Sequence, residues 1–449
     1  MPLKLQFGSS GIRGKYPEGV NPAVAVELAR RITAGVGRRI AVGHDSRSSG
    51  PVLKATLLST ALEAGAVVSD YGLLPTPALS YETRFRELDW GIMITASHNP
   101  TEYIGFKVFN SLGEAFDDES TLPAVDQSEE APSLSRFGEV ENCDSSQYEA
   151  ALSEISFKRS WKVVLDPGNG AASDVAPRVY TRALGNVTSM NCIREAEFSG
   201  RGPEPTAENM RMLCSAVRGT RAHAGIAFDG DGDRMFMIDE KGECHLQDRI
   251  LSAFISFLSS QSNGPFVVPL DVSMSVDEVA ERLDAKIVRG PVGDAKLLRE
   301  MKAVGGTFAG EPSGAWIHPQ FNPCPDGILS GLLFLQAVEN DGRPISQVIG
   351  DVPEYHIIRE NLPIRHADMS KTTPVQTIGR EIERIVGQHA TSEDRFGLRV
   401  STDQSWVLVR QSGTEPVLRV TVESKAGSEA VRIMKETIRF LHRRMKGRL

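Results

Sequence analysis

The stretch W-G-I-M-I-T-A-S-H-N-P, residues 90–100, joins a short apolar run to a polar loop. The apolar residues indicate a buried β-strand, and the polar residues that follow would lie at its carboxyl end. Upstream, Asn21 and Pro22 form an N-cap and first-turn pair that predicts the start of a helix. The first 100 residues predict strands at 39–43, 66–70 and 90–95 and helices at 21–34, 49–64 and 78–86. Strands separated by helices of this length predict a mostly parallel α/β sheet.

This pattern of strands and helices restarts twice along the chain and then changes. Strands are expected at 161–165, 225–228 and 265–269, with an apolar helix beginning near residue 247. After residue 351, helices near 375–388 and at the C-terminus flank strands at 397–401 and 406–410. We therefore expect three similar α/β domains and a C-terminal α+β domain, with bounds at 1–150, 151–246, 247–352 and 353–449. A linker rich in Ser, Pro and Glu is expected at 122–136.

Composition excludes several classes of protein. The 449 residues carry 50 Lys and Arg against 58 Asp and Glu, so the basic surface of a nucleic-acid-binding protein is not expected. Five scattered cysteines without a C-x-x-C pair argue against a disulfide scaffold and a four-cysteine zinc site. A signal peptide and an apolar run of the ~20 residues needed to cross a membrane are not found. We expect a cytoplasmic monomer or homodimer that acts on a small molecule, with no nucleic-acid or membrane partner.

The first polar cluster is T-A-S-H-N-P, residues 95–100. In open α/β sheets, ligands bind beyond the carboxyl ends of the strands. Ser97 would lie at such a strand end, where it could act as a nucleophile or carry a phosphate if a base and charge-stabilising groups converge on it. An ordinary Ser/Asn/Pro turn is the alternative.

The second cluster is D-G-D-G-D-R, residues 229–234. Carboxylates at Asp229, Asp231 and Asp233, separated by glycines, let the backbone wrap around one hard cation, and oxygen-only ligands favour Mg²⁺. An EF-hand is disfavoured because Arg234 stands where that loop needs glycine. A phosphatase of the haloacid dehalogenase type is an alternative, in which Asp229 would be the nucleophile. An acidic turn without a cation is disfavoured by self-repulsion.

Three further loops are polar and rich in glycine. G-E-P-S-G, residues 310–314, offers a carboxylate and a hydroxyl that suit neighbouring sugar hydroxyls. R-Q-S-G-T-E-P-V-L-R, residues 410–419, has the arginines, hydroxyls and turn of a phosphate cradle, and G-S-S-G-I-R-G, residues 8–14, adds another arginine. Each alone fits a plain turn. Together with the serine and the metal loop they indicate phosphoryl transfer on a phosphosugar.

With these motifs in place, the sequence resembles the α-D-phosphohexomutase family over nearly its whole length. F-G-S-S-G-I-R-G resembles the family's opening loop, and the other four motifs resemble, in order, its phosphoserine, metal, sugar-binding and phosphate-binding loops. G-H-D-S-R (43–47), P-E-P-T-A-E-N (203–209) and P-V-G-D (291–294) also fall where family segments do. The resemblance implies four domains around a central cleft, the last with a fold like the TATA-binding protein.

The resemblance also implies a mechanism. A hexose 6-phosphate and a hexose 1-phosphate would be interconverted by phosphoserine at Ser97, through a bound hexose 1,6-bisphosphate that also serves as activator. Mg²⁺ would be held by Asp229, Asp231, Asp233 and the Ser97 phosphate. Arg13, His98 and Lys107 would surround the phosphoserine, with Lys107 a general acid/base whose pKa we expect Arg13 to lower. The substrate would contact Arg234, Glu311, Ser313, Arg410, Ser412, Gly413, Thr414 and Arg419.

Two departures from the family pattern stand out. The family commonly has histidine after G-E-x-S-G, whereas this chain has Ala315, and His318 nearby is interpreted as an ordinary loop residue. Ile104 replaces the asparagine of N-G-x-K. Within the family, the chain most resembles the phosphoglucosamine mutases, with phosphomannomutase/phosphoglucomutase as the alternative. The departures leave a sugar-phosphate-binding pseudoenzyme as a further alternative.

Overall fold

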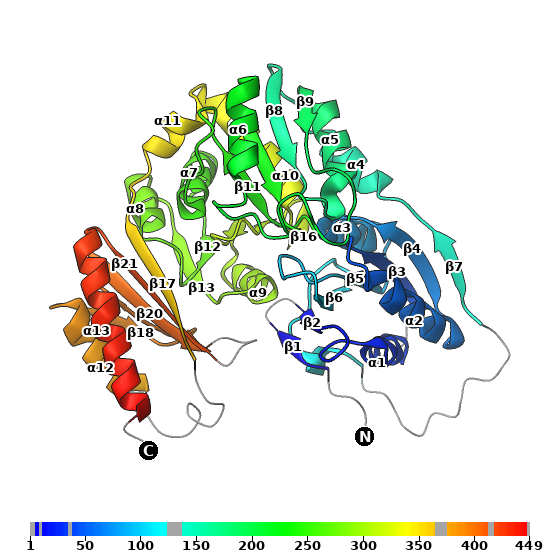
Figure 1. Cartoon of the computed structure of the whole chain (residues 1–449), viewed down its shortest axis with the longest axis horizontal. Coiled ribbons are helices and arrows are strands. Elements are labelled where there is room, and N and C mark those ends of the chain that lie inside the picture. The colour runs from blue at the N-terminus through cyan, green and yellow to red at the C-terminus, as the bar shows by residue number, and fades with distance from the viewer. Residues whose placement is uncertain are drawn as a thin grey trace.

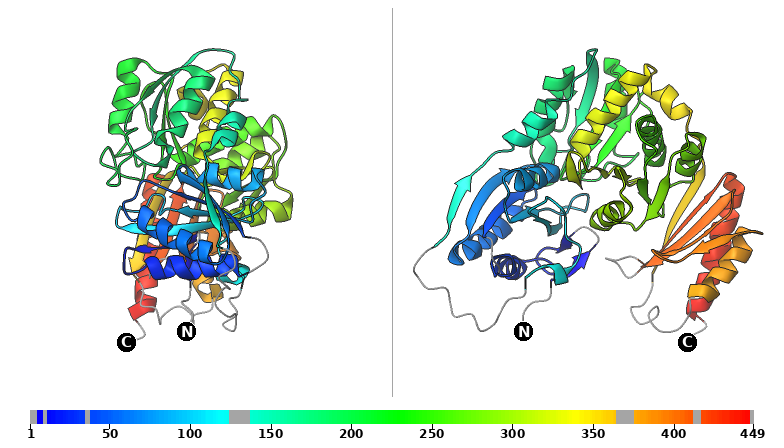
Figure 2. Two further views of the ribbon diagram at one scale, coloured as in Figure 1. Left: turned by 90° about the vertical axis from the view of Figure 1, so that its right-hand side faces the viewer. Right: turned by 180° about the vertical axis from the view of Figure 1, so that it is seen from behind.

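Four β-sheets follow one another along the chain and define four structural units. The structure is a computed structural model, and it describes residues 5–8, 11–34, 38–123, 137–363, 375–411 and 417–446. The units form a curve from the N-terminal to the C-terminal sheet, and the view from behind shows the same curve (Figures 1 and 2). The predicted architecture of three similar α/β domains and a C-terminal α+β domain is confirmed. The predicted bounds at 150, 246 and 352 stay predictions.

Unit I contains seven strands in the order β1-β2-β6-β5-β3-β4-β7. They are β1 (Phe7–Gly8), β2 (Gly11–Lys15), β3 (Arg39–His44), β4 (Val67–Leu73), β5 (Trp90–Ile94), β6 (Tyr103–Asn110) and β7 (Glu139–Asn142). Its helices are α1 (Pro22–Thr33), α2 (Gly50–Glu63) and α3 (Thr76–Phe85). The Asn21 side chain caps α1 by accepting a hydrogen bond from the backbone N–H of Ala23, as the sequence predicts.

Units II and III repeat the central part of unit I. Unit II has the strand order β11-β10-β8-β9 and unit III the order β13-β12-β14-β15-β16. Their strands are β8 (Trp161–Asp166), β9 (Gly185–Ser189), β10 (Ala224–Phe228), β11 (Met235–Ile238), β12 (Phe266–Pro269), β13 (Ile287–Gly290), β14 (Phe308–Gly310), β15 (Trp316–His318) and β16 (Asn322–Pro325). Their helices are α4 (Ser146–Leu152), α5 (Val175–Leu184), α6 (Arg211–Thr220), α7 (Gln247–Ser259), α8 (Ser275–Arg282), α9 (Asp294–Val304), α10 (Gly327–Asp341) and α11 (Ile345–Gly350).

In each of these three units, three parallel strands are followed by an antiparallel fourth. The matching rows are β4-β3-β5-β6, β9-β8-β10-β11 and β13-β12-β14-β15. The loop that leaves the third parallel strand therefore turns back directly into a hairpin. Those hairpin loops carry the serine, metal and sugar motifs of the three units. They follow the carboxyl ends of parallel strands, which is where ligands bind in open α/β sheets.

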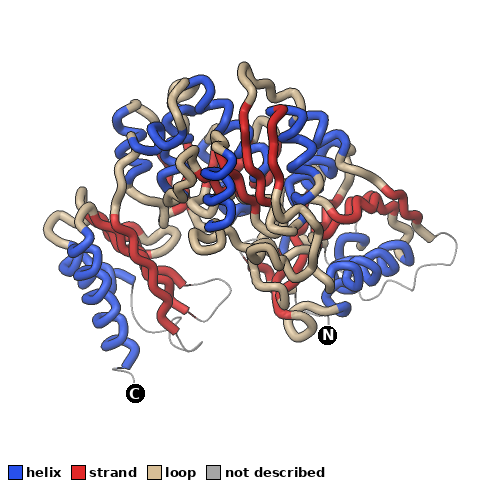
Figure 3. The backbone as a smooth tube through the Cα atoms, turned by 45° about the horizontal axis from the view of Figure 1, so that its top comes forward, coloured by secondary structure: helices blue, strands red, loops and turns tan. Residues whose placement is uncertain are grey.

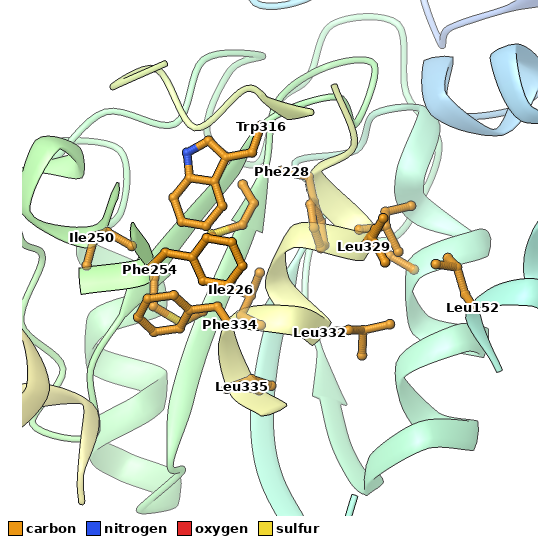
Figure 4. Packing of buried hydrophobic residues seen from close by; sticks show 14 of the residues in the cluster. Leu152, Ile226, Phe228, Ile250, Phe254, Trp316, Leu329, Leu332, Phe334 and Leu335 are labelled. Atoms are coloured by element: carbon orange, nitrogen blue, oxygen red, sulfur yellow. The ribbon is translucent and has the colours of Figure 1, made fainter. Parts of the chain in front are cut away.

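One hydrophobic core runs through units I, II and III. Its aromatic centre stacks Trp316 on Phe254 with ring centroids 4.8 Å apart, and Phe334 of α10 packs beside them (Figure 4). The same core takes in Ile226 of β10 and Met93 of β5, so that side chains of three units are buried together. Burial of this kind stabilises by roughly 25 cal/mol per Å² of apolar surface. The three units therefore form one rigid support.

Unit IV has a core of its own. Its antiparallel sheet has the order β17-β21-β20-β19-β18, with α12 and α13 on one face (Figure 3). The elements are β17 (His356–Pro363), β18 (Thr391–Glu393), β19 (Leu398–Ser401), β20 (Ser405–Gln411), β21 (Val417–Ser424), α12 (Val375–Val386) and α13 (Gly427–Lys446). A small cluster of Leu270, Trp406 and Leu408 joins it to unit III. Most of the predicted linker lies outside the described residues, and no described helix is long and apolar enough to cross a membrane.

Asp326 should contribute measurably to stability, because it caps α10 and also accepts a buried hydrogen bond. Its Oδ1 accepts from the N–H of Leu329 at 2.9 Å, and both carboxylate oxygens lie within 3.0 Å of the Tyr148 hydroxyl. We expect Asp326→Ala to lower the free energy of unfolding by about 2–4 kcal/mol, since it removes a cap and leaves a buried donor unpaired. Asp326→Asn, which can still cap, should cost about 1 kcal/mol or less. Urea unfolding of both variants tests this, and equal losses would contradict it.

Candidate active site

Ser97 lies directly after β5 and is held in an uncommon backbone conformation. Its φ is 52°, in the left-handed region, and the residue is 1% exposed. The hydroxyl donates a hydrogen bond to Oδ2 of Asp229 at 2.7 Å and lies 3.2 Å from Nδ1 of His98. A non-glycine residue with positive φ persists only where its surroundings hold it. The loop of unit I thus presents one buried hydroxyl to the metal loop of unit II.

The metal loop connects β10 to β11 and reaches Ser97 because it contains glycine. A Cβ atom on Gly230 would lie 2.5 Å from the backbone oxygen of Ser97, so no larger residue fits without a shift. The loop brings Asp229, Asp231 and Asp233 together, with one carboxylate oxygen of each within 4.8 Å of the others. All three side chains are buried.

Burial and mutual repulsion set the charges of this triad. Burial, together with Asp233 and Asp231, raises the pKa of Asp229 well above its usual range. Burial also works against the ionised form of Asp231, but the Lys107 ammonium and the Thr76 hydroxyl outweigh it and hold the pKa of Asp231 below its usual range. The three carboxylates thus compete for the positive charge beside them.

Lys107 supplies that charge, and this corrects one expectation. Its Nζ lies 2.8 Å from Oδ2 of Asp231 and also pairs with Asp233. Burial alone would lower the pKa of Lys107, but these two carboxylates raise it above its ordinary value, against a smaller opposite effect of Arg13. Arg13 lowers this pKa, as expected, but the two carboxylates outweigh it and the net shift is upward, because the sequence did not show that they contact the ammonium.

The triad fits a divalent cation. Oδ1 of Asp231 and Oδ1 of Asp233 are buried and accept no hydrogen bond from any described residue. Unpaired buried carboxylate oxygens are costly, and hard cations such as Mg²⁺ take oxygen ligands of this kind. Within the described ranges, this is the group of acidic, histidine or cysteine residues that could hold a metal ion.

Cationic groups surround the serine loop. Arg13 of β2 donates to Oδ1 of Asn99 at 3.3 Å, and Nε of Arg234 lies 3.9 Å from Asp229 and from Asp233. The positive charge of Arg234, then burial, then Arg13 lower the pKa of His98 far below its usual range. His98 is therefore a neutral imidazole at physiological pH, with one ring nitrogen near the Ser97 hydroxyl.

The sugar motif forms the β14–β15 hairpin of unit III. Glu311 accepts hydrogen bonds from the N–H of Gly293 at 2.8 Å and from the Ser313 hydroxyl at 3.1 Å. Burial raises the pKa of Glu311 to about 7, against the opposing effects of the Gly293 N–H and Arg234. This carboxyl group therefore changes charge near neutral pH.

A cleft of about 1530 Å³ brings predicted catalytic and substrate-binding residues of all four units together. Its lining includes Arg13, His98, Arg234, Glu311, Ser313, Arg410 and Arg419. Arg410 and Arg419 are register partners on β20 and β21, which sets two cations side by side. Ser97, Lys107 and the Asp triad are not in the lining and lie behind its wall, next to His98 and Arg234. Ser412, Gly413 and Thr414 lie outside the described residues.

The structure places the two departures from the family pattern. Ala315 is buried and pairs through its backbone with Arg234, so it offers no side chain for proton transfer. His318 is not a loop residue, as we had interpreted it, but lies in β15, buried against Phe254 and within 3.0 Å of the Ser330 hydroxyl. Ile104 lies in β6 and packs into the core of unit I.

Thr76 is one site residue that the sequence analysis missed. Its hydroxyl donates to Oδ2 of Asp231 at 2.5 Å, and its N–H donates to the Asp231 backbone oxygen at 2.9 Å. It begins α3, at the carboxyl end of β4. Its position after a parallel strand could have identified Thr76 as a site residue, but the surrounding sequence P-T-P matches no functional motif.

Comparisons with known proteins agree along the whole chain. Models of the phosphoglucomutase/phosphomannomutase family match residues 4–131 (alpha/beta/alpha domain I), 145–242 (domain II), 247–355 (domain III) and 370–439 (C-terminal domain). A "Probable phosphoglucosamine mutase" of Methanothermobacter thermautotrophicus is 34% identical and covers 99% of this chain and 97% of its own. A "Phosphoglucosamine mutase" of Methanococcus maripaludis is 35% identical, with 97% and 98% covered. A phosphoglucomutase/phosphomannomutase family protein of Burkholderia thailandensis has the same fold, with a TM-score of 0.83 at 23% identity, covering 99% of this chain and 98% of its own.

Removal of one triad carboxylate should weaken metal binding. We expect one Mn²⁺, as a paramagnetic substitute for Mg²⁺, to bind the wild-type chain, and Asp231→Asn to weaken that binding by about tenfold or more, since a charged ligand is lost. Asp239→Asn is the matched control, because Asp239 is equally buried but pairs with His245 outside the triad. Electron paramagnetic resonance titration measures both, and equal affinities in the two variants would exclude the triad as the site.

Proposed function

We propose that this chain, which belongs to the phosphoglucomutase/phosphomannomutase family, interconverts glucosamine 6-phosphate and glucosamine 1-phosphate through a phosphoserine at Ser97. The four family models and the full-length relatives establish the family. The chain is therefore an isomerase of the phosphohexomutase type. The choice of glucosamine rests on the relatives named phosphoglucosamine mutase at 34–35% identity.

One observation carries the proposed chemistry: the Ser97 hydroxyl is hydrogen-bonded to the first carboxylate of the metal loop. A nucleophile becomes effective when a base and charge-stabilising groups are within reach of it. The Ser97 hydroxyl donates to the Asp229 carboxylate, and the Arg13 and Arg234 side chains flank the loop. These groups support phosphoryl transfer to and from Ser97.

The reaction would proceed in two transfers. First, the P–Oγ bond of phosphoserine breaks and a P–O bond forms with the free hydroxyl of the sugar monophosphate, whose proton ends on Ser97 Oγ, so that a 1,6-bisphosphate results. The bisphosphate then turns over in the cleft. In the second transfer its other phosphoryl group leaves the sugar oxygen and returns to Ser97 Oγ, and the Oγ proton ends on that sugar oxygen, so the numbers of phosphoryl groups and protons are unchanged. A trace of hexose 1,6-bisphosphate would rephosphorylate any enzyme that had lost its phosphate.

Resident groups would divide the work of binding. Mg²⁺, when bound by Asp229, Asp231, Asp233 and the Ser97 phosphate, supplies positive charge next to the transferred phosphoryl group. Arg410 and Arg419 suit the phosphate that does not react, because paired guanidinium groups bind phosphate oxygens strongly. Glu311 and Ser313 suit the sugar's 3- and 4-hydroxyls. A fixed distal phosphate site would serve both orientations of the bisphosphate.

Replacement of Ser97 separates this mechanism from that of an aspartyl phosphatase. We expect Ser97→Ala to lower mutase turnover on glucosamine 1-phosphate by at least about a thousandfold, since the phosphoryl carrier is removed. Assays contain Mg²⁺ and a trace of hexose 1,6-bisphosphate, and Ser215→Ala, an exposed helical serine, should retain wild-type turnover. Retained activity in Ser97→Ala, lost in Asp229→Asn, would favour the phosphatase.

The relative kcat/KM values for glucosamine, mannose and glucose 1-phosphates identify the sugar in the same assay. A higher value for mannose or glucose 1-phosphate would favour phosphomannomutase/phosphoglucomutase. Binding without turnover on all three would favour the pseudoenzyme that Ala315 motivates.

The pH profile should report the ionisation of Glu311. Because burial raises its pKa to about 7, the carboxylate that accepts hydrogen bonds from sugar hydroxyls is lost as the pH falls below 7. We therefore expect kcat/KM, which reports the free enzyme, to fall on the acid side with an apparent pKa near 7. In Glu311→Gln this limb should disappear, while the limb from the substrate phosphate stays. An unchanged profile in Glu311→Gln would contradict the assignment.

A further inference from the structure

Arg47 lies in the G-H-D-S-R segment after β3, which has no part in the mechanism above. Its guanidinium group is buried and donates hydrogen bonds to four backbone carbonyl oxygens of the serine loop. Nη2 donates to the oxygens of Ser97 at 2.8 Å and Asn99 at 2.6 Å, and Nη1 donates to those of Pro100 at 2.6 Å and Tyr103 at 2.9 Å. One planar cation therefore gathers the whole loop from Ser97 to the start of β6.

The remaining donor of Arg47 connects to the other side of Ser97. Nε of Arg47 donates to Oδ2 of Asp45 at 3.0 Å, in an ion pair with no solvent exposure. The same Asp45 oxygen accepts from the Thr95 hydroxyl at 2.7 Å, which orients the hydroxyl so that it accepts the N–H of Ser97 at 2.8 Å. Both polar backbone groups of Ser97 are thus held, the C=O directly by Arg47 and the N–H through Asp45 and Thr95.

The guanidinium group of Arg47 also contacts an aromatic residue of unit II. The Phe198 ring centroid lies 5.2 Å from Cζ of Arg47, within the range of a cation–π contact, and Phe198 is 1% exposed. Phe198 also lies near the position that a Cβ on Gly230 of the metal loop would take. Arg47 therefore contacts both the serine loop and Phe198, a residue that lies beside the metal loop.

We propose that Arg47, with Asp45 and Thr95, is a positioning residue for phosphoryl transfer that holds Ser97 in its left-handed conformation and aims Oγ at the metal loop. The proposal rests on the phosphoserine mechanism proposed above. It assigns Arg47 no contact with substrate. Misplacement of a reacting group by about 1 Å can cost on the order of a hundredfold in rate, so a residue of this kind acts on kcat.

Lysine cannot replace this arginine. Its ammonium keeps the charge for Asp45 but is a compact group with three donors, whereas the guanidinium has five donors in a fixed plane. We expect Arg47→Lys to retain the buried ion pair and lose most of the carbonyl contacts. Arg249→Lys is the matched control, because Arg249 is another mostly buried arginine that donates to two carbonyl oxygens, those of Ile349 and Val352, away from the cleft.

The first measurement does not depend on catalysis. Hydrogen exchange followed by mass spectrometry should show the amides of residues 97–103 exchanging at least about tenfold faster in Arg47→Lys than in the wild-type chain, because their loop opens more easily. Arg249→Lys should leave these amides unchanged. Protection equal to wild type in Arg47→Lys would overturn the proposal.

The second measurement is steady-state mutase kinetics below the unfolding temperature of each variant. We expect Arg47→Lys to lower kcat on the order of a hundredfold with KM changed by less than about threefold, and the rate of Ser97 phosphorylation by the bisphosphate to fall by the same factor. Arg249→Lys should keep wild-type kcat even where its melting temperature falls. An unchanged kcat, or an equal loss in both variants, would overturn the proposal.

A second variant tests the positioning role of Arg47, Asp45 and Thr95 if Arg47→Lys does not fold. Thr95→Val removes the acceptor for the Ser97 N–H while it leaves Arg47 in place, and it should give faster exchange at residues 97–99 with a lower kcat. Wild-type exchange and wild-type kcat in Thr95→Val would overturn the proposal. If the wild-type chain itself lacks mutase turnover, the proposed function fails, and hydrogen exchange alone then decides whether Arg47 holds the loop.

Discussion

The structure depends on one electrostatic constraint: three buried carboxylates lie within 4.8 Å of one another. Like charges at this separation cannot all ionise without a cation, and burial raises the cost further. Polar groups around the triad supply positive charge or a hydrogen bond to its carboxylates. Lys107 comes from β6 of unit I, Thr76 from the start of α3, and Arg234 from the metal loop itself. Unit I and unit II must therefore stay in contact at this point, and the shared core behind them keeps them there.

Each α/β unit has a buried or mostly buried arginine that donates hydrogen bonds to loop carbonyl groups near the carboxyl end of its sheet. Arg47 gathers the serine loop, and Arg201 pairs with Asp166 and donates to the backbone oxygens of Asp166 and Phe228, where the metal loop begins. In unit III, Arg289 donates to the oxygens of Val272 and Ser273 after β12. Backbone carbonyl groups in the loop after a strand have no hydrogen-bond partner in the sheet. A buried acceptor without a partner lowers the stability of the fold. The three related units thus all use an arginine side chain to pair such loop carbonyl groups.

Unit IV stands apart in its packing. Its core is separate from that of the other units, and it meets unit III through Trp406, Leu408 and Leu270 and through an ion pair of Arg395 with Glu300. The arginines proposed to bind phosphate are on this separately packed unit, whereas the serine and metal loops are on the shared core. An enzyme whose bisphosphate must turn over within the cleft would benefit from this division, since one wall can move while the reacting groups keep their geometry.

The sequence by itself determined the alternation of strands and helices, the four-unit architecture and the loops that carry the chemistry. These follow from local patterns: apolar strands, the Asn21 cap, and glycine-separated carboxylates that suit a cation. The tertiary structure alone decided which groups meet. It set Lys107 against Asp231 and Asp233 and so reversed the expected pKa shift, buried His318 in a strand, and brought Thr76 and Arg47 to the site. The physical reason is that charge, burial and hydrogen bonding depend on distances between segments far apart in the chain, which no local pattern of residues specifies.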